Sequence, residues 1–453
     1  MTASGVEQHT AQQVARSDVP SAPVDTRYIL TLLFLINLLN FYDRQILGVV
    51  AEPIRIEWQL TDTHIGWMGT AFTLLYAAIG LPLGRLADTV ARTRVLAIGV
   101  TVWSAFTAFT GLAWGYWSMF VARMGVGVGE ASCSPASNSL IGELFPPERR
   151  ARAIGTFMLG LPIGILLSSV LSGLIARAYG WRMSFFVAAV PGLILAFLIA
   201  RVRDPRHSSS VKSIEATEST TSAGSSKLAP FVELWNIPTL RWIVISGALH
   251  NFNAYAVNAF LAAYMMRYHG VSLATASIAG GVTLGAVGVI GLVAGGYFAD
   301  RARQRGAHAR LQLGALSMLL SVPCMAAALL FPSGAVIPFV IMMALGWMFS
   351  YVYYVTTYPA IHDVVRPGLR GTAMAVYFFW MYVLGGAFGT AILGMLSDYY
   401  AHRSMILEGA AQITDSARAT GLHDAFMIVP LIALVLSVVV WMGSRSLKIE
   451  GAK

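Results

Sequence analysis

Hydrophobic runs of helix-spanning length recur along this chain and are separated by short polar segments. Each run is long enough for an α-helix to cross a bilayer core of about 30 Å, and too long for the strand of a membrane barrel. We therefore predict an all-α integral membrane protein with twelve transmembrane helices. They lie near residues 28–50, 64–86, 95–114, 116–141, 153–176, 183–200, 241–266, 274–299, 311–331, 335–360, 371–396 and 424–443.

Composition supports a membrane location. Of the 453 residues, 56% are hydrophobic and 12% are charged, whereas about a quarter of the residues are charged in soluble domains. The net charge of +9 does not indicate nucleic-acid binding, because the basic residues lie between the hydrophobic runs and form no single patch. Residues 1–27 are polar and lack the apolar core of a signal peptide, so we expect the first run to direct insertion.

The distribution of basic residues predicts the orientation. If both termini are cytoplasmic, the cytoplasmic segments hold 23 of the 31 Lys and Arg, and the external loops hold 6. This excess follows the positive-inside rule. We expect a multi-pass protein of the cell (inner or plasma) membrane with both termini in the cytoplasm.

The chain divides near its middle. The segment Ser208–Ser226 is rich in Ser and Thr and has no aromatic residue, which is typical of a flexible linker. Six predicted helices lie on each side of it, and the external loop near 397–422 shows no chemical motif. The expected parts are a polar N-terminus (1–27), a six-helix bundle (28–200), the linker (201–240), a second six-helix bundle (241–443) and a cytoplasmic tail (444–453).

Two short patterns occur once in each half. Gly84-Arg-Leu-Ala-Asp88 ends the second run, and Gly296-Tyr-Phe-Ala-Asp300 ends the eighth, 212 residues later. Gly155-Thr156 opens the fifth run, and Gly371-Thr372 opens the eleventh, 216 residues later. The nearly equal offsets predict a parallel repeat of two six-helix halves.

Glycines spaced by four lie on the second, fifth, eighth and eleventh runs, where they allow helices to approach closely. Ordinary packing explains part of this pattern. We expect in addition that these four helices form the faces along which the two halves move. The pairs are Gly80 with Gly84, Gly160 with Gly164, Gly281 with Gly285, Gly291 with Gly295, and Gly385 with Gly389.

An acid and a base, Asp43 and Arg44, interrupt the first run. An unpaired charge at the centre of a bilayer costs at least about 2.5–3.5 kcal/mol. Glu130 on the fourth run is a partner at matching depth, because Asp43 and Glu130 each lie about 21–22 Å along their helices from the same membrane surface. Arg123 precedes Glu130 by two helical turns and shares its face.

These four residues suggest a proton-coupling switch. Burial and mutual repulsion disfavour the charged forms of two acids that share one base. Uptake of a proton by Asp43 or Glu130 is therefore expected to release Arg44 and to favour one conformation. The alternative is a permanent salt-bridge network that only holds the first half together.

The second half is chemically different, because the interiors of its seventh to eleventh runs contain no Asp, Glu, Lys or Arg. They offer neutral polar and aromatic side chains, most of which we expect to pack or to face lipid. A charged wall near Arg44 opposite an aromatic wall would suit an amphipathic substrate. The candidate substrate-binding residues are Arg44, His250, Asn258, Tyr353, Tyr354, Tyr377 and Trp380.

The repeated Gly-Asp pattern at the cytoplasmic ends predicts a latch. Asp88 is placed to accept hydrogen bonds from the bases after the fourth run, or to face the N-terminus of the eleventh helix beyond Arg370. Helix-end solubility is the alternative explanation for Asp88 and Asp300. The candidate gate residues are Gly84, Asp88, Arg92, Arg149, Arg150, Arg152 and Asp300.

No pattern indicates catalysis. The sequence lacks a glycine-rich phosphate loop followed by Lys-Ser/Thr, a Cys/His cluster at metal spacing, and a nucleophile in register with a base. We expect no enzyme activity, no cofactor, no metal and no nucleic-acid partner. The expected partners are a small amphipathic substrate, protons and the lipid bilayer.

The residues after the second run resemble the signature of the major facilitator superfamily, Gly-x-Leu-x-Asp-Arg-x-x-Arg. This chain has Gly84, Leu86, Asp88 and Arg92, and it departs from the signature at Thr89, where a base is usual.

Further segments resemble the spinster-like transporters of that superfamily. Asn40-Phe-Tyr-Asp43-Arg44 is similar to their first helix, and Arg123-x3-Gly127-x-Gly129-Glu130 is similar to their fourth, continuing to Glu143-Leu-Phe-Pro146. Gly180-Trp181-Arg182 is a common feature of the superfamily.

The resemblance implies a monomeric secondary transporter that has the major facilitator fold and works by alternating access. It also implies a lysophospholipid or sphingoid-type substrate and coupling to protons. The runner-up is a proton- or sodium-linked transporter of organic anions or drug-like amphipaths. The alternative of another class is a membrane receptor or sensor that binds a ligand without moving it.

Overall fold

The computed structural model describes residues 25–202, 204, 229–366 and 369–450, and all regular structure in these residues is helical. In chain order the helices are α2 (Thr26–Trp58), α3 (Asp62–Thr89), α4 (Arg92–Gly111), α5 (Tyr116–Glu130), α6 (Cys133–Leu144), α7 (Pro147–Met158), α8 (Gly160–Tyr179), α9 (Trp181–Ala200), α11 (Ala229–Trp235), α12 (Pro238–Tyr268), α13 (Leu273–Gly280), α14 (Val287–Arg303), α15 (Ala307–Leu330), α16 (Val336–Val364), α17 (Arg370–Trp380), α18 (Ala387–Glu408), α19 (Asp415–Phe426) and α20 (Ile428–Glu450). Two π-helical segments, η2 (Gly281–Ala286) and η4 (Met381–Gly386), join α13 to α14 and α17 to α18.

The helices confirm the all-α membrane fold. Within the described ranges, nine helical stretches are long and apolar enough to cross a membrane. The other three predicted spans, near 64–86, 116–141 and 241–266, are helical as α3, as α5 with α6, and as α12. The fourth of the predicted spans is divided between α5 and α6, of 15 and 12 residues, so neither part alone has the length of a membrane span.

Local capping explains where the first two spans begin. The Asp25 carboxylate accepts hydrogen bonds from the backbone N–H groups of Arg27 and Tyr28 at the start of α2. Thr61 caps α3, and the side chain of His64 completes a reciprocal capping box. Such caps satisfy backbone donors that have no partner within the helix. The connection between α2 and α3 is therefore short and well defined.

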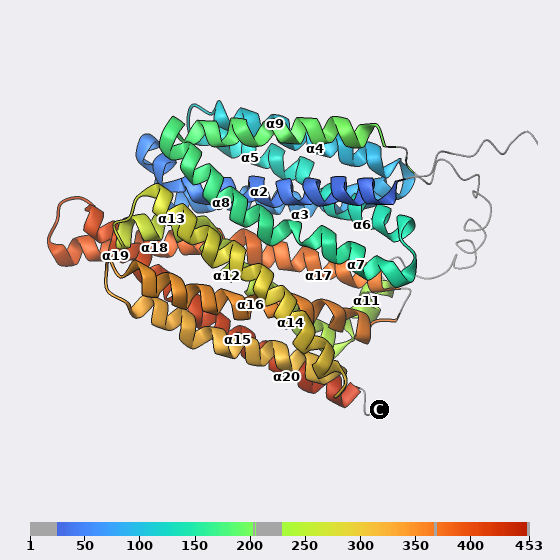
Figure 1. The fold of residues 1–453 in the computed structure, drawn as a ribbon. Coiled ribbons are helices and arrows are strands. Elements are labelled where there is room, and N and C mark those ends of the chain that lie inside the picture. Colours follow the sequence, from blue (N-terminus) through green and yellow to red (C-terminus); the bar gives the residue numbers. More distant parts are fainter. Residues whose placement is uncertain (1–24, 203, 205–228, 367–368, 451–453) are drawn as a thin grey trace, which may run out of the picture.

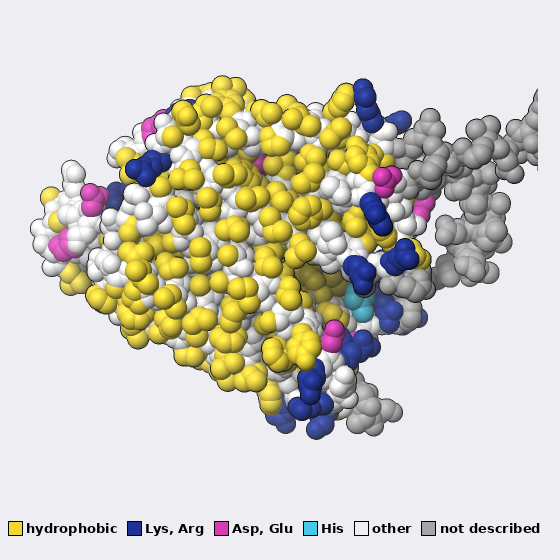
Figure 2. Space-filling model, in the orientation of Figure 1, with side chains coloured by type: hydrophobic (Ala, Val, Ile, Leu, Met, Phe, Trp, Pro, Cys, Tyr) yellow, Lys and Arg dark blue, Asp and Glu magenta, His cyan; other side chains and the backbone are white. Residues whose placement is uncertain are grey.

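The helices pack in two groups, α2–α9 in blue to green and α12–α20 in yellow to red (Figure 1). We call these groups the first and second halves. The last turns of α20 and many Lys and Arg side chains lie at one end of the molecule, which we call the basic end (Figures 1 and 2). The opposite end, which contains Arg267 at the last turn of α12, is called the Arg267 end. Between the two ends the visible surface is mainly hydrophobic (Figure 2).

The same side-chain contact occurs in both halves. Asn37 of α2 donates from Nδ2 to the carbonyl of Phe157 at 2.8 Å, beside the break between α7 and α8. Asn251 of α12 donates in the same way to the carbonyl of Met381 at 3.2 Å, where η4 begins. The numbers 37 and 251 differ by 214, which lies between the offsets of 212 and 216 found in the sequence. The contact therefore supports the parallel repeat.

Paired glycines of the fifth and eleventh predicted spans serve contacts within a half. A Cβ on Gly164 would lie 2.4 Å from the carbonyl oxygen of Leu38, and one on Gly389 would lie 2.5 Å from that of Phe252. Each of these helices thus packs on the first helix of its own half. The expectation is confirmed for the helices, because α3 packs on α18 and α8 packs on α13 and η2 across the boundary between the halves. Gly164 and Gly389, however, serve the close approach inside a bundle.

The glycines of the eighth predicted span are divided between two uses. Gly281 and Gly285 of η2 lie against Leu166 of α8, across the boundary between the halves. Gly291 and Gly295 of α14 lie against α16 in their own half. A Cβ on Gly80 would meet nothing within 4 Å.

The expected external loop near 397–422 is largely helical. α18 continues to Glu408, and α19 begins at Asp415 behind the Thr414 cap. Hydropathy falls in this segment, but a helix can leave a bilayer and continue in water. Residues 1–24 of the predicted N-terminus, most of the predicted linker (205–228) and the last residues of the tail (451–453) lie outside the described residues.

Candidate functional site

Arg44 and Glu130 form an ion pair between α2 and α5. Arg44 Nε donates to Oε2 of Glu130 at 2.7 Å, and Glu130 is fully buried. Arg44 lies near the middle of the 33-residue helix α2. The sequence placed Asp43, Arg44 and Glu130 at one depth without deciding which groups meet, and the contact of Arg44 with Glu130 confirms the depth argument.

An interruption in the fourth span positions Glu130. It is the last residue of α5, and Ala131 and Ser132 separate α5 from α6. Just before it, a Cβ on Gly129 would lie 2.5 Å from the backbone nitrogen of Trp103, so α5 packs very closely on α4. A helix break at this depth is tolerated in membrane proteins where surrounding protein covers it.

Arg44 also contacts the second half. Its Nη1 donates to the Tyr255 hydroxyl of α12 at 3.3 Å. The guanidinium lies 4.3 Å from the ring centroid of Tyr76 on α3, and an aromatic face attracts a cation at this distance. Tyr382 of η4 packs against Tyr76 and Tyr255, with centroid separations of 4.9 and 6.2 Å. One guanidinium is therefore shared by a buried acid of the first half and an aromatic group of the second.

Asp43 and Arg123 lie close to this pair without a salt bridge of their own. Asp43 is fully buried; its Oδ2 accepts from the Thr107 hydroxyl at 3.3 Å, and its Oδ1 has no partner. Arg123 lies 5.0 Å from the ring centroid of Phe72, and its Nε and Nη1 have no partner. Glu130 Oε1 has none either. Buried polar atoms without partners are uncommon and need a particular explanation.

The four charges have a definite chemical capability. They form one strong ion pair, Arg44 with Glu130, and leave an acid and a base with polar atoms to satisfy. A proton added to Asp43 or Glu130 changes which charges need compensation, and in a buried site this change is costly to leave uncompensated. The proton-coupling role of these four residues stays a prediction.

Four of the predicted substrate residues form a cluster in the second half. Tyr353 and Tyr377 are fully buried and share a hydrogen bond of 3.1 Å, and Tyr353 also pairs with the Ser246 hydroxyl at 2.8 Å. The buried His250 ring stacks on Tyr353 at 4.3 Å and meets Tyr354 edge-on at 4.8 Å. His250 Nε2 has no partner, and Tyr354 is half-buried. This cluster combines an apolar surface with one unsatisfied nitrogen.

Asn258 and Trp380 lie apart from that cluster. Asn258 donates to the Ala254 carbonyl of its own helix at 3.0 Å, and its backbone packs on Gly48 of α2. Trp380 is half-buried at the end of α17 and packs edge-on against Phe379. Their roles in substrate binding stay predictions.

The candidate gate residues are spread over the basic end. Arg92 is buried and pairs with Glu143 of α6 and with Asp204, so it ties together segments of the first half. The side chains of Gly84 and Asp88 lie outside the described residues, and the gate assignment stays a prediction. The exposed candidates are Arg149, Arg150, Arg152 and Asp300.

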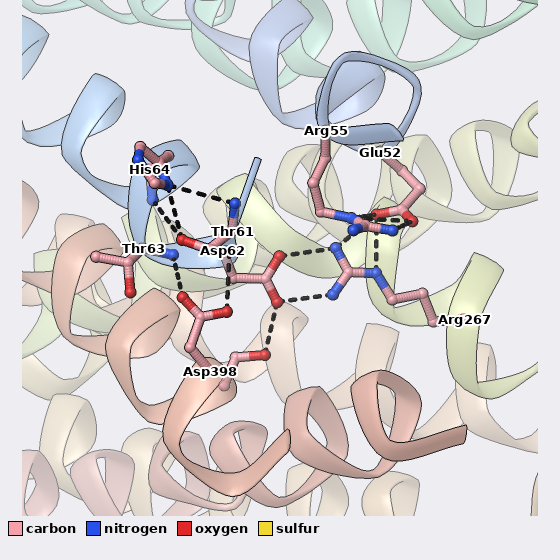
Figure 3. Close-up of polar contacts among 9 residues, drawn as sticks. Glu52, Arg55, Thr61, Asp62, Thr63, His64, Arg267 and Asp398 are labelled. Carbon is pink, nitrogen blue, oxygen red and sulfur yellow. Dashed lines mark hydrogen bonds and ion pairs between the residues drawn. The ribbon is translucent and has the colours of Figure 1, made fainter. Parts of the chain in front are cut away.

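Ion pairs between the two halves, among the described side chains, lie at the Arg267 end. Arg267 of α12 binds Glu52 of α2 and Asp62 of α3 (Figure 3). The sequence analysis does not single out Arg267, Glu52 or Asp62. The missed signal is that Glu52, Asp62 and Arg267 flank three predicted spans on the same side of the membrane and carry opposite charges.

Comparison with known proteins identifies the family. The family model of the Major Facilitator Superfamily matches residues 33–408. An MFS-type efflux pump of Mycolicibacterium smegmatis is 29% identical to this chain and covers 91% of it, with 91% of the pump matched. A probable sphingolipid transporter of Arabidopsis thaliana, spinster homolog 1, is 24% identical and covers 82% of this chain, with 82% of that protein matched.

A solved structure agrees with these relatives. It is a bacterial homologue of the human lysosomal transporter Spinster in an inward-facing, unoccupied conformation. Its TM-score is 0.83 at 27% sequence identity, over 95% of this chain and 98% of that one. The matched residues span both halves and include Asp43, Arg44 and Glu130. The chain therefore belongs to the Major Facilitator Superfamily of membrane transporters and resembles the spinster proteins within it.

Proposed function

We propose that this protein is an alternating-access transporter that couples protons to the movement of an amphipathic, lipid-like substrate of the lysophospholipid or sphingoid type. The observation that carries the proposal is the position of Arg44 between buried Glu130 in the first half and Tyr255 in the second. A proton on the acid, an anionic headgroup and a movement between the halves all act on this one guanidinium.

The proposal includes an orientation. The basic end faces the cytoplasm, because positive loops stay on that side. In the described state the halves are joined by ion pairs at the Arg267 end, which is then the external end. This state is inward-facing, as is the solved spinster homologue.

The substrate class is supported by two kinds of surface. Arg44 can bind a phosphate or carboxylate through two parallel hydrogen bonds. The tyrosines around it and the His250 cluster supply apolar area for a tail. The similarity to the probable sphingolipid transporter of Arabidopsis thaliana supports this class. The efflux pump of Mycolicibacterium smegmatis supports the second candidate, a transporter of organic anions or drug-like amphipaths.

A thermal-shift screen distinguishes these substrates. We expect lysophospholipids to raise the unfolding temperature of the purified protein more than small organic anions do, because only they fill both surfaces. Arg44→Ala should remove the shift, since the headgroup then lacks its partner, whereas Arg182→Ala at an exposed pair should keep it. A shift that survives Arg44→Ala places the headgroup elsewhere.

A further inference from the structure

We propose that Arg267 and Asp398 form a latch that holds the Arg267 end of the two halves together and sets the balance between the two access states. The inference rests on the alternating-access part of the proposed function. It adds the residues that close one side.

Arg267 binds two helices of the first half at once. Its Nε and Nη2 donate to Oε2 of Glu52 on α2, at 2.8 and 2.5 Å. Its Nη1 and Nη2 donate to the two carboxylate oxygens of Asp62 on α3, each at 2.7 Å. Figure 3 shows the guanidinium between the two carboxylates. The bidentate contact with Asp62 is the strongest geometry for such a pair.

Burial makes this network decisive for the closed arrangement. The side chains of Arg267, Glu52 and Asp62 are 8%, 5% and 4% exposed. When one partner of a buried ion pair is removed, the remaining charge is left uncompensated and the arrangement is strongly destabilised. Loss of the Arg267 charge should therefore disfavour the state in which this end is closed.

Asp398 adds a second connection, because it caps a helix of the other half. Its carboxylate oxygens accept from the backbone N–H groups of Asp62 at 3.1 Å and Thr63 at 2.8 Å, at the start of α3. The neighbouring Ser397 hydroxyl donates to Asp62 Oδ2 at 2.7 Å. An acid at a helix N-terminus satisfies free donors and complements the helix dipole. Here the acid comes from α18, so the cap is lost when the halves separate.

The two acids that bind Arg267 differ in whether they keep an ion pair when the halves separate. Glu52 is also held by Arg55, whose Nη2 donates to its Oε1 at 2.7 Å within the first half. Among the described side chains, Asp62 forms an ion pair only with Arg267, which belongs to the other half. Arg267 in turn forms ion pairs only with Asp62 and Glu52. The free energy of the latch is therefore concentrated in the pair of Arg267 with Asp62 and in the Asp398 cap.

The latch is tested by distances at the Arg267 end. Spin labels are placed at Tyr179 on α8 and Thr275 on α13, which are exposed and belong to different halves, in a protein with Cys133 and Cys324 replaced by Ala. Arg267→Gln should raise the ratio of long to short distances about tenfold or more. Asp398→Asn should shift it in the same direction by less, because it weakens only the cap.

The matched control is Arg182→Gln. Arg182 pairs with Glu57 at the same end, but both residues belong to the first half and are well exposed. This variant should keep the distances of the unmodified protein. If the protein with Arg267→Gln does not fold, the label distances in the Asp398→Asn variant still test the proposal, because this substitution leaves the ion pairs of Arg267 intact.

Unchanged distances in both Arg267→Gln and Asp398→Asn would overturn the latch. The measurement uses neither substrate nor a pH gradient. A protein that exchanges substrate across a bilayer but shows unchanged distances thus contradicts the latch alone and leaves the proposed function standing.

Discussion

At the scale of single residues, the charges inside the bundle differ in how well they are compensated. Arg44 has an ion pair, a hydrogen bond and an aromatic face. Asp43 and Arg123 retain buried polar atoms without partners. A fully satisfied network would be a static support, whereas this incomplete one has groups that a proton or a substrate can satisfy. The incompleteness favours the switch hypothesis over the permanent salt bridge.

Neutralising either acid should separate coupling from transport. Asp43→Asn and Glu130→Gln are expected to abolish accumulation of labelled substrate driven by an imposed pH gradient in proteoliposomes, because neither amide takes up a proton in this range. Exchange of substrate without a gradient should persist. Glu57→Gln, an exposed acid at the Arg267 end, serves as the control and should retain gradient-driven uptake. Accumulation by both amide variants at the normal rate contradicts the switch.

The sequence predicts part of this site and misses part for a physical reason. Helical rise gives the depth of a residue, so Arg44 and Glu130 could be matched across two helices. Helix rotation and neighbour order are tertiary properties, so the contact of Arg44 with Tyr255 was not predictable. Arg267 was overlooked because a charge at a helix end normally lies in water, and its burial appears only when α2, α3 and α12 converge.

At the scale of helices, irregular points are supported by side chains from a neighbouring helix. Asn37 donates a hydrogen bond to the carbonyl of Phe157 beside the α7–α8 break. Asn251 donates one to the carbonyl of Met381 at the start of η4. Hydropathy identified each spanning segment, because an apolar run of this length has few other solutions. It did not reveal the breaks or the π-helical turns, which depend on partners distant in sequence.

The close packing inside the first half can be tested with a single methyl group. Gly164→Ala should destabilise the protein by about 1–3 kcal/mol, because its Cβ would lie 2.4 Å from the Leu38 carbonyl oxygen. Gly80→Ala should be nearly neutral, since a Cβ there meets nothing within 4 Å. The readout is the unfolding temperature in detergent. Equal stability of the two variants would show that α8 does not need its close approach to α2.

At the scale of the whole molecule, the two halves are joined differently at their two ends. At the Arg267 end, α12 and α18 bind α2 and α3 through ion pairs and a helix cap. At the basic end, the described ion pairs of Arg92 and Arg310 stay within one half. Among the described residues, the ion pairs between the halves are therefore confined to the Arg267 end.

The close contact between α2 and α12 near the Arg267 end can be tested independently of charge. A Cβ on Gly48 of α2 would lie 2.2 Å from the Asn258 carbonyl oxygen of α12. Gly48→Ala should therefore push the halves apart and lengthen the distance between labels at Tyr179 and Thr275, with Gly80→Ala as the unaffected control. If Gly48→Ala leaves the short distance dominant, the contact between α2 and α12 is not what limits opening.

The central claim, that this protein moves an amphipathic substrate across a bilayer, is tested most directly by counterflow. Proteoliposomes are loaded with unlabelled lysophospholipid, and labelled lysophospholipid is added outside at low concentration without a pH gradient. The account predicts transient accumulation of label above the level of protein-free liposomes, reduced by Arg44→Ala. Saturable binding without any exchange of label would contradict it and would instead indicate a receptor.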